Sequence, residues 1–226
     1  MPWSEGGLAE APRPHADAVV VPVPVAPSGI AGERDIAAIT YGAHPEKKGL
    51  GRVILAWGRA RRDGEELVVA GVDEERALRA WGAAHFAEAR AQGLRPRHIS
   101  GARPEGVRFT GALPREEYRA LVRRACVFAT APRREDYGIA QLEALADGCA
   151  LVTTSAPGPY AALPLARGLD PRLVTEDLAG ALRAALDEPS PGYAERAAAA
   201  LRPWAPEEVD RVVADVLLPR LLDSGR

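Results

Sequence analysis

Short apolar runs and amphipathic stretches alternate along the chain from Asp35 onwards, and this alternation limits the fold more than any other feature. The apolar runs have strand length, and the stretches between them repeat apolar residues at helical spacing. Alternation of this kind with short connections predicts an α/β fold, in which helices cover both faces of a parallel sheet. Ligands bind such sheets outside the carboxyl ends of the strands, so we expect functional residues in the loops that follow strands. The predicted strands are 36–41, 66–70, 107–110, 126–129 and 150–153, and the helices between them begin at residues 50, 74, 115 and 138.

The two ends of the chain differ from this central pattern. The first 34 residues are rich in Pro, Gly and Ala, and only 19–25 looks like a strand, which Pro22 and Pro24 would confine to the edge of a sheet. The C-terminal part has helical spacing, and its predicted helices are 175–187, 193–201 and 206–222. We therefore divide the chain into a linker-like segment at 1–34, one domain at 35–222 and a tail at 223–226.

The composition argues against several classes of protein. The chain has 29 Lys and Arg against 31 Asp and Glu, a formal net charge of -2, which removes the phosphate-neutralising attraction of nucleic-acid binders. Cys126 and Cys149 are too few for a disulfide scaffold and lack metal-ligand spacing, so we expect unreactive thiols in a reducing compartment. The apolar run at 18–27 contains three prolines and is far shorter than the ~20 residues of a membrane span. We expect a cytoplasmic protein that binds no nucleic acid; attachment to a membrane surface stays open but is not indicated.

Lys47 and Lys48 are the only lysines among the 29 basic side chains. They stand together in the loop 42–49, which connects a predicted strand to a predicted helix and ends in Gly49. A lysine is a compact point charge that suits phosphate oxygens, so this loop is a candidate phosphate site. A solvated pair of loop charges is the alternative interpretation.

A second loop, 132–136, is strongly charged and leads into the helix expected to begin at Gly138. It places Glu135 at the mouth of the candidate site and Glu143 eight positions later. Carboxylates accept paired hydrogen bonds from the vicinal hydroxyls of sugars. Gly138 permits close approach of the backbone, and the free amides of a helix start bind anions. A sugar and a diphosphate require these groups; an ordinary acidic helix start, favoured by the helix dipole, is the alternative.

Taken together, these motifs resemble the C-terminal nucleotide-sugar-binding domain of retaining GT-B glycosyltransferases of the family-four type. The loop 42–49 is similar to the family's Gly-Arg-x-x-x-x-Lys-Gly motif, and 135–143 is similar to its Glu-x7-Glu motif, continued by Ala-Leu-Ala-Asp-Gly at 144–148. The segment 107–111 is similar to the family's strand beside the nucleotide base, and 202–204 is similar to its Trp before the last helix. The resemblance covers about 35–222 and implies a Rossmann-like domain that forms a single GT-B C-terminal half.

The resemblance also implies a role for each residue in these motifs. Lys48 would bind the donor diphosphate and Glu135 the transferred sugar, and these two are the catalytic candidates. Glu143 would bind the ribose hydroxyls, and the backbone amides of Gly138 and Ile139 would bind phosphate. The other candidate donor-binding residues are Lys47, His44 and Arg134.

The implied activity is transfer of a sugar from a nucleotide-diphosphate sugar to an unknown acceptor, of hexosyltransferase type and with retention of configuration. No side-chain nucleophile is needed, because in this family the donor diphosphate helps to deprotonate the acceptor hydroxyl. Catalysis then consists of positioning and charge stabilisation. We expect no cofactor and no metal ion, since the chain has no Asp-x-Asp motif and Lys48 with the helix start would neutralise the diphosphate.

The chain departs from the family pattern in two ways. Ala43 stands where the family has Arg, which removes one diphosphate contact, and His44, Arg133 and Arg134 are the candidate replacements. A complete GT-B enzyme also has an N-terminal acceptor domain, whereas only 34 residues precede the predicted domain. We interpret 1–34 as a linker or a remnant of that domain and expect the acceptor domain as a partner. The alternatives are a non-catalytic nucleotide-sugar-binding regulatory subunit and a GT-B-like epimerase.

Overall fold

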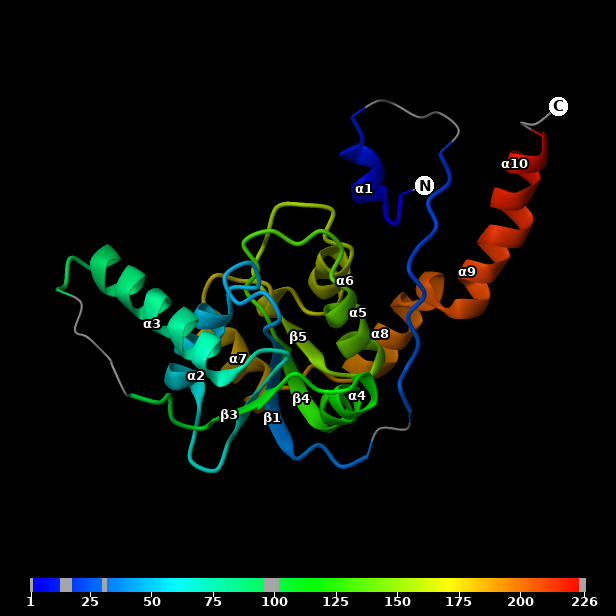
Figure 1. Ribbon diagram of the computed structural model, residues 1–226. Helices are drawn as coiled ribbons and strands as arrows, with labels where there is room; N and C mark the ends of the chain where they lie inside the picture. The colour runs from blue at the N-terminus through cyan, green and yellow to red at the C-terminus, as the bar shows by residue number, and fades with distance from the viewer. Residues whose placement is uncertain (1, 13–17, 30–31, 96–101, 224–226) are drawn as a thin grey trace.

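The computed structural model describes residues 2–12, 18–29, 32–95 and 102–223, and its centre is a five-stranded parallel sheet (Figure 1). The strands are β1 (Ile36–Tyr41), β2 (Leu67–Ala70), β3 (Val107–Gly111), β4 (Ala125–Ala129) and β5 (Ala150–Val152). Their order in the sheet is β3-β2-β1-β4-β5, and every pairing is parallel. β1 is the central strand: β2 and then β3 follow on one side of it, and β4 and then β5 follow on the other side. β1 and β4 are therefore neighbours in space although they are far apart in sequence.

Helices cover both faces of this sheet (Figure 1). The helices of the described residues are α1 (Glu5–Ala9), α2 (Leu50–Ala60), α3 (Glu74–Ala91), α4 (Arg115–Arg124), α5 (Ile139–Ala146), α6 (Ala162–Leu169), α7 (Leu178–Asp187), α8 (Tyr193–Ala200), α9 (Pro206–Val212) and α10 (Leu218–Asp223). Of these, α1, α9 and α10 lie away from the sheet (Figure 1). On one face α2 packs against α3 and α7, and on the other face α4 and α5 cover the sheet, with α6 and α8 beside α5. The predicted α/β, Rossmann-like fold is confirmed.

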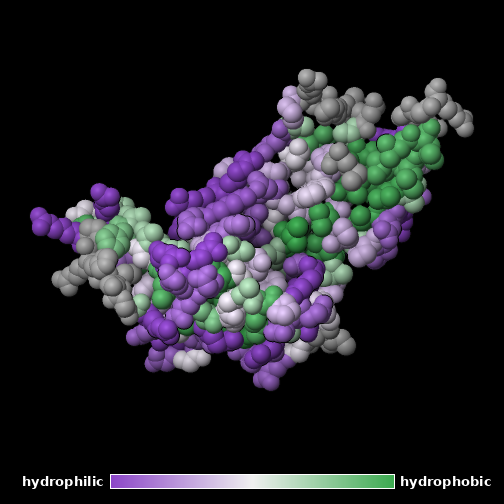
Figure 2. Space-filling view, in the orientation of Figure 1, coloured by the Kyte–Doolittle hydropathy of each residue, from purple (hydrophilic) through white to green (hydrophobic). Residues whose placement is uncertain are grey.

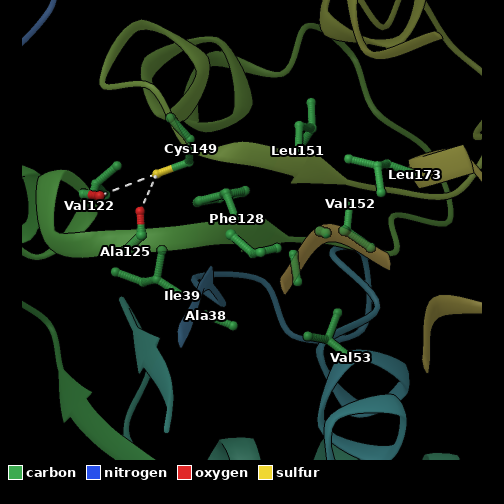
Figure 3. Close-up of a cluster of buried hydrophobic side chains, with 14 of the residues drawn as sticks. Ala38, Ile39, Val53, Val122, Ala125, Phe128, Cys149, Leu151, Val152 and Leu173 are labelled. Atoms are coloured by element: carbon green, nitrogen blue, oxygen red, sulfur yellow. Dashed lines mark hydrogen bonds between the residues drawn. The ribbon is translucent and has the colours of Figure 1, made fainter. Parts of the chain in front are cut away.

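The hydrophobic core lies between the sheet and these helix layers. All four residues of β2 are buried, as expected for a strand of a parallel sheet that is covered on both faces. Trp57 of α2 and Phe128 of β4 are among the largest fully buried side chains. Figure 3 shows Phe128 near Leu151 of the neighbouring strand. The continuous apolar character of the strands thus gives the sheet two buried faces.

Both cysteines are free, and Cys149 lies within this core. Its Sγ donates to the backbone carbonyl oxygens of Val122 and Ala125, at 3.2 and 3.4 Å (Figure 3). Burial raises the pKa of Cys149 to about 12, and burial also raises the pKa of Cys126. Thiols that stay protonated are poor nucleophiles, in agreement with the expectation that they are unreactive.

The prediction of a strand at 19–25 was wrong. Its two prolines have no N–H group to give to a ladder, and the amides of Val23 and Val25 bond outside the sheet. The N–H of Val23 donates to the hydroxyl of Tyr137 at 3.0 Å, and the N–H of Val25 donates to the carbonyl oxygen of Trp204 at 2.8 Å. Alternating valines therefore produce an extended segment that lies against the domain without joining the sheet.

Other differences from the predicted elements are local. The helix α6 was not predicted, and α7 begins at Leu178 rather than at 175, because the side chain of Asp177 caps it by accepting from the N–H of Gly180 at 3.0 Å. The predicted C-terminal helix continues through a π-helical turn, Val213–Leu217. Residues 224–226 of the predicted tail lie outside the described residues.

Apolar side chains gather on the surface over α10, at the upper right of Figure 2. Leu218, Leu221 and Leu222 of this helix are exposed. Within the described ranges, no helix combines the length and the apolar character that crossing a bilayer requires.

Candidate functional site

The loops that follow β1 and β4 meet at the carboxyl edge of the sheet (Figure 1). The connection after β1 continues to β2 on one side, and the connection after β4 continues to β5 on the other side. Such a reversal of strand order is the switch point at which open α/β sheets bind ligands. Two backbone hydrogen bonds join the loops. The N–H of Ala131 donates to the carbonyl oxygen of Lys48 at 3.3 Å, and the N–H of Arg133 donates to the carbonyl oxygen of Lys47 at 2.9 Å.

Gly49 makes this close approach of the two loops possible. It precedes α2 with φ 63°, in the left-handed region that favours glycine. A Cβ atom at this position would lie 1.8 Å from the carbonyl oxygen of Ala131. The glycine that ends the lysine loop therefore lets the backbone of the β4 loop pass directly against it.

Lys48 and Glu135 contact each other across the switch point. Lys48 Nζ lies 2.6 Å from Glu135 Oε2, and the two side chains are only 18% and 5% exposed. The amide Nε2 of Gln141, on α5, donates to the same carboxylate oxygen at 3.0 Å. Removing one partner would leave a poorly hydrated charge, which is costly. The structure thus brings together the two residues that the sequence predicted as catalytic.

The amino end of α5 lies next in the chain. Gly138 precedes the helix with φ 92°, and no side chain caps the helix amides there. A Cβ atom on Gly138 would lie 2.8 Å from the ring of Tyr160, so only glycine fits this position without displacement. Ile139, the first helical residue, is partly exposed. Uncapped amides at the start of a helix are a favourable environment for an anion.

Glu143 lies in a separate cluster, on the side of α5 that contacts α4. Its Oε1 forms ion pairs with Arg115 Nη2 at 2.5 Å and with Arg119 Nη1 at 3.2 Å. The side chains of Glu143 and Arg119 are buried, whereas that of Arg115 is largely exposed. Among the described residues, no hydrogen bond reaches Oε2 of Glu143, and no ion pair joins Glu143 to Lys48.

Lys47 and Arg134 belong to a third, exposed group of charges. Both side chains contact the carboxylate of Asp136, Arg134 Nε at 3.0 Å. Arg134 Nη2 also lies 2.6 Å from Glu10 Oε2, beside α1. The hydrogen bond from Lys47, aided by Arg134, holds the pKa of Asp136 below its usual range. These two predicted donor-binding cations are therefore paired with carboxylates of their own chain.

The remaining residues of the lysine loop contribute backbone contacts. The carbonyl oxygen of His44 accepts from the N–H of Lys48 at 2.8 Å, which closes a turn of the loop. Ala43 offers no charged group. Arg133 is exposed and lines a cavity of about 450 Å³ beside α2 together with Glu46 and Gly49. Among the described residues, no group of three His, Cys, Asp or Glu side chains could hold a metal ion.

Sequence comparison identifies the family. The sequence pattern described as Glycosyl transferases group 1 matches residues 35–188, which is more than half of the chain. The chain belongs to this family. The sequence resemblance to GT-B glycosyltransferases is thereby confirmed. No curated protein has a significant sequence match to this group 1 glycosyltransferase chain.

Solved structures share the fold of this group 1 chain at low sequence identity. WaaG, a glycosyltransferase involved in lipopolysaccharide biosynthesis, aligns with a TM-score of 0.55 and 21% identity, covering 82% of this chain and 48% of WaaG. AviGT4, a glycosyltransferase involved in avilamycin A biosynthesis, aligns with a TM-score of 0.61 and 19% identity; the alignment covers 98% of this chain and 63% of AviGT4. HepE of Anabaena, in complex with UDP and glucose, aligns with a TM-score of 0.59 and 14% identity; the alignment covers 82% of this chain and 49% of HepE. The chain thus spans about half the length of WaaG and HepE.

Three polar side chains at the site of this group 1 chain were not predicted from the sequence. Gln141 donates to Glu135, and Arg115 and Arg119 pair with Glu143. The spacing of the two arginines, four positions apart and hence on one face of a helix, was the available signal. Their carboxylate partner depends on how α4 packs beside α5, which the sequence pattern does not give.

Proposed function

We propose that this chain binds a nucleotide-diphosphate sugar at the switch point between β1 and β4 and transfers the sugar with retention of configuration, as a hexosyltransferase-type glycosyltransferase. The observation that carries the proposal is the contact between Lys48 and Glu135 beside the uncapped start of α5. It combines a cation, a carboxylate and free helix amides on two loops that are joined by hydrogen bonds. Membership of the family and the UDP and glucose bound to HepE, which has the same fold, support the proposal.

In this proposal the diphosphate binds to Lys48 Nζ and to the backbone amides of Gly138 and Ile139. The ion pair between Lys48 and Glu135 then opens, and each partner exchanges the other for a group of the donor. Lys47 and Arg134 exchange Asp136 for phosphate oxygens, and His44 contributes from the same loop. These groups neutralise the diphosphate without a metal ion or a cofactor, and we propose none.

Glu135 accepts hydrogen bonds from the hydroxyls of the transferred sugar, while Glu143 accepts them from the ribose through Oε2. As the bond to the sugar breaks, Lys48 and the amides of α5 stabilise the charge that develops on the leaving diphosphate. The acceptor hydroxyl attacks from the face on which the diphosphate leaves and gives its proton to the diphosphate. The product therefore retains the configuration of the donor, and no side chain acts as a nucleophile.

The acceptor-binding half is proposed to lie outside the described domain, in a separate chain or segment. This proposal is supported by the length of the chain, which spans only about half of WaaG and of HepE. In this arrangement 1–34 is the connection to that half, and the domain at 35–222 is the donor half. The donor site then faces the acceptor half across an open cleft.

Ala43 favours a second candidate function, a regulatory subunit that binds the nucleotide sugar without transferring it. The loop lacks the guanidinium that the family places beside the diphosphate. Loss of one charge-assisted hydrogen bond costs about 1.5–3 kcal/mol. That amounts to between one and two powers of ten in rate if the contact acts only in the transition state. Binding without transfer is the outcome that distinguishes this candidate.

Titration calorimetry with UDP-, GDP- and ADP-sugars tests the proposed site. We expect one of them to bind and Lys48→Ala to lower its affinity about tenfold or more, because a charge-assisted contact is lost. Arg124→Ala is the matched control, since Arg124 is a half-exposed cation that pairs with Asp35 just before β1, at the opposite edge of the sheet, and it should leave the affinity unchanged. No heat with any of the sugars at millimolar concentration would contradict the proposal. Donor hydrolysis or sugar transfer then separates the enzyme from the regulatory subunit.

A further inference from the structure

Arg119 of α4 lies between two carboxylates at the end of α5. Its Nε donates to Asp147 Oδ2 at 2.8 Å, and its Nη1 lies 3.2 Å from Glu143 Oε1. The side chains of Arg119, Asp147 and Glu143 are only 4%, 0% and 8% exposed. The two carboxylates are four positions apart, Glu143 within α5 and Asp147 at the residue that ends it, so they lie one turn apart on the same side and their like charges repel each other. A cation between them removes this repulsion.

The guanidinium of Arg119 stays charged in these surroundings. Burial disfavours its charged form, but the hydrogen bond to Asp147 and the charges of Asp147 and Glu143 outweigh this, so the pKa of Arg119 lies above its usual value. A planar, rigid guanidinium holds two carboxylates in fixed directions, which a flexible ammonium group does not. Arg115 contacts the same Oε1 of Glu143 from the exposed side. Both arginines therefore engage Oε1.

The same network includes residues of the extended segment 18–29. The N–H of Ser28 donates to Asp147 Oδ1 at 2.7 Å, and its hydroxyl donates to Oδ2 at 2.9 Å. Arg119 Nη2 donates to the carbonyl oxygen of Ala26 at 3.1 Å. A continuous set of hydrogen bonds and ion pairs therefore runs from segment 18–29, through Asp147 and Arg119, to Glu143.

We propose that Arg119 is a positioning residue for the donor nucleotide. By holding Oε1, it fixes the Glu143 carboxylate so that Oε2 accepts from the ribose hydroxyls, and segment 18–29 holds Arg119 in place. The inference rests on the proposed function, because it assumes that Glu143 binds ribose. Arg119 touches no donor atom and acts only through Glu143.

The test compares a ribonucleoside diphosphate with its 2′-deoxy form by calorimetry, using UDP, GDP and ADP as probes. The unsubstituted chain is expected to bind the ribo form of its nucleotide about tenfold more tightly, and Arg119→Met is expected to bring the two affinities together. Glu143→Gln should do the same, and the double variant should lose no further discrimination. Arg183→Met is the matched control: Arg183 also pairs with two carboxylates, those of Glu65 and Asp187, and donates to a backbone carbonyl oxygen. It should keep the tenfold preference.

The outcomes separate the two levels of the proposal. A purely structural role of Arg119 would weaken both nucleotides equally, so an unchanged preference in Arg119→Met overturns this inference and leaves the proposed function standing. Absence of binding of all three diphosphates to the unsubstituted chain overturns the proposed function, and this inference with it. If Arg119→Met does not fold, Arg119→Lys replaces it. Lysine keeps the charge but lacks the planar fork, so the preference should fall part of the way, and an unchanged preference contradicts the inference.

Discussion

Substituting Gly49 by alanine would test the close contact between the two loops of the candidate site. The added Cβ would lie 1.8 Å from the carbonyl oxygen of Ala131, whereas such contacts are essentially never shorter than 3.0 Å. One of the two loops would therefore have to move by about 1 Å, a misplacement of the size that disrupts a positioned site. This displacement would break the hydrogen bonds from Ala131 to Lys48 and from Arg133 to Lys47.

The loss of stability follows from two separable contributions. Alanine in the left-handed region costs about 1–2 kcal/mol, and each of the two lost backbone hydrogen bonds costs about 1 kcal/mol. We expect Gly49→Ala to lower the free energy of unfolding by about 3–4 kcal/mol. Gly64→Ala is the matched control, since Gly64 has φ 84° with no atom within 4 Å of the added Cβ. Gly64→Ala should therefore lose only the stability that alanine costs in the left-handed region.

Urea unfolding followed by tryptophan fluorescence measures both variants, with linear extrapolation to water. The difference between them isolates the contact of Gly49 with the β4 loop from the backbone strain that both variants share. Equal losses in Gly49→Ala and Gly64→Ala would refute the argument, because the loops would then not be held together as described.

Three further predictions concern other parts of the domain. Iodoacetamide at about pH 8 should modify Cys149 only after unfolding, as followed by mass spectrometry, because burial raises the pKa of Cys149 to about 12; rapid modification of the folded chain would contradict this. Asp170→Asn should lower stability at neutral pH, because the hydrogen bond from Arg172 holds the pKa of Asp170 below its unfolded value. This stability is lost as pH falls through the folded-state pKa, so the unfolding free energies of the two chains should converge at pH values below that pKa. Asp177→Ala removes the cap of α7 and should cost about 1 kcal/mol in thermal unfolding, and an unchanged midpoint would show that the cap is dispensable.

The sheet and most of its helices were predictable because each segment shows a single pattern: a short apolar run for a strand, or apolar residues at helical spacing for a helix. The strand at 36–41 was predicted with the bounds that the structure has, and the helix predicted to begin at residue 74 begins there. The helix α6 was missed because Pro164 and Gly168 interrupt its pattern, although a proline is tolerated in the first turn of a helix. The segment 19–25 was mistaken for a strand because its alternating valines match a strand, while its amides find partners that no local pattern predicts.

The candidate site was predictable only where topology decides it. Lys48 and Glu135 each follow a strand of a parallel sheet, so their loops reach the same edge. That the two strands are neighbours is known only from the structure. The pairing of Glu143 with Arg115 and Arg119 depends instead on the packing of α4 beside α5. Periodicity fixes which face of a helix a residue occupies but not which helix lies opposite.

The closed contact between Lys48 and Glu135 has a consequence for selectivity. At the proposed site, an inorganic phosphate ion that drew the ammonium group away would leave a carboxylate with 5% exposure facing a second anion, so we expect free phosphate to compete poorly for this position. A molecule that carries an anionic group at one end and hydroxyl donors at the other satisfies both partners at once. Under the proposed function, the site would therefore discriminate by requiring two chemistries from a single ligand.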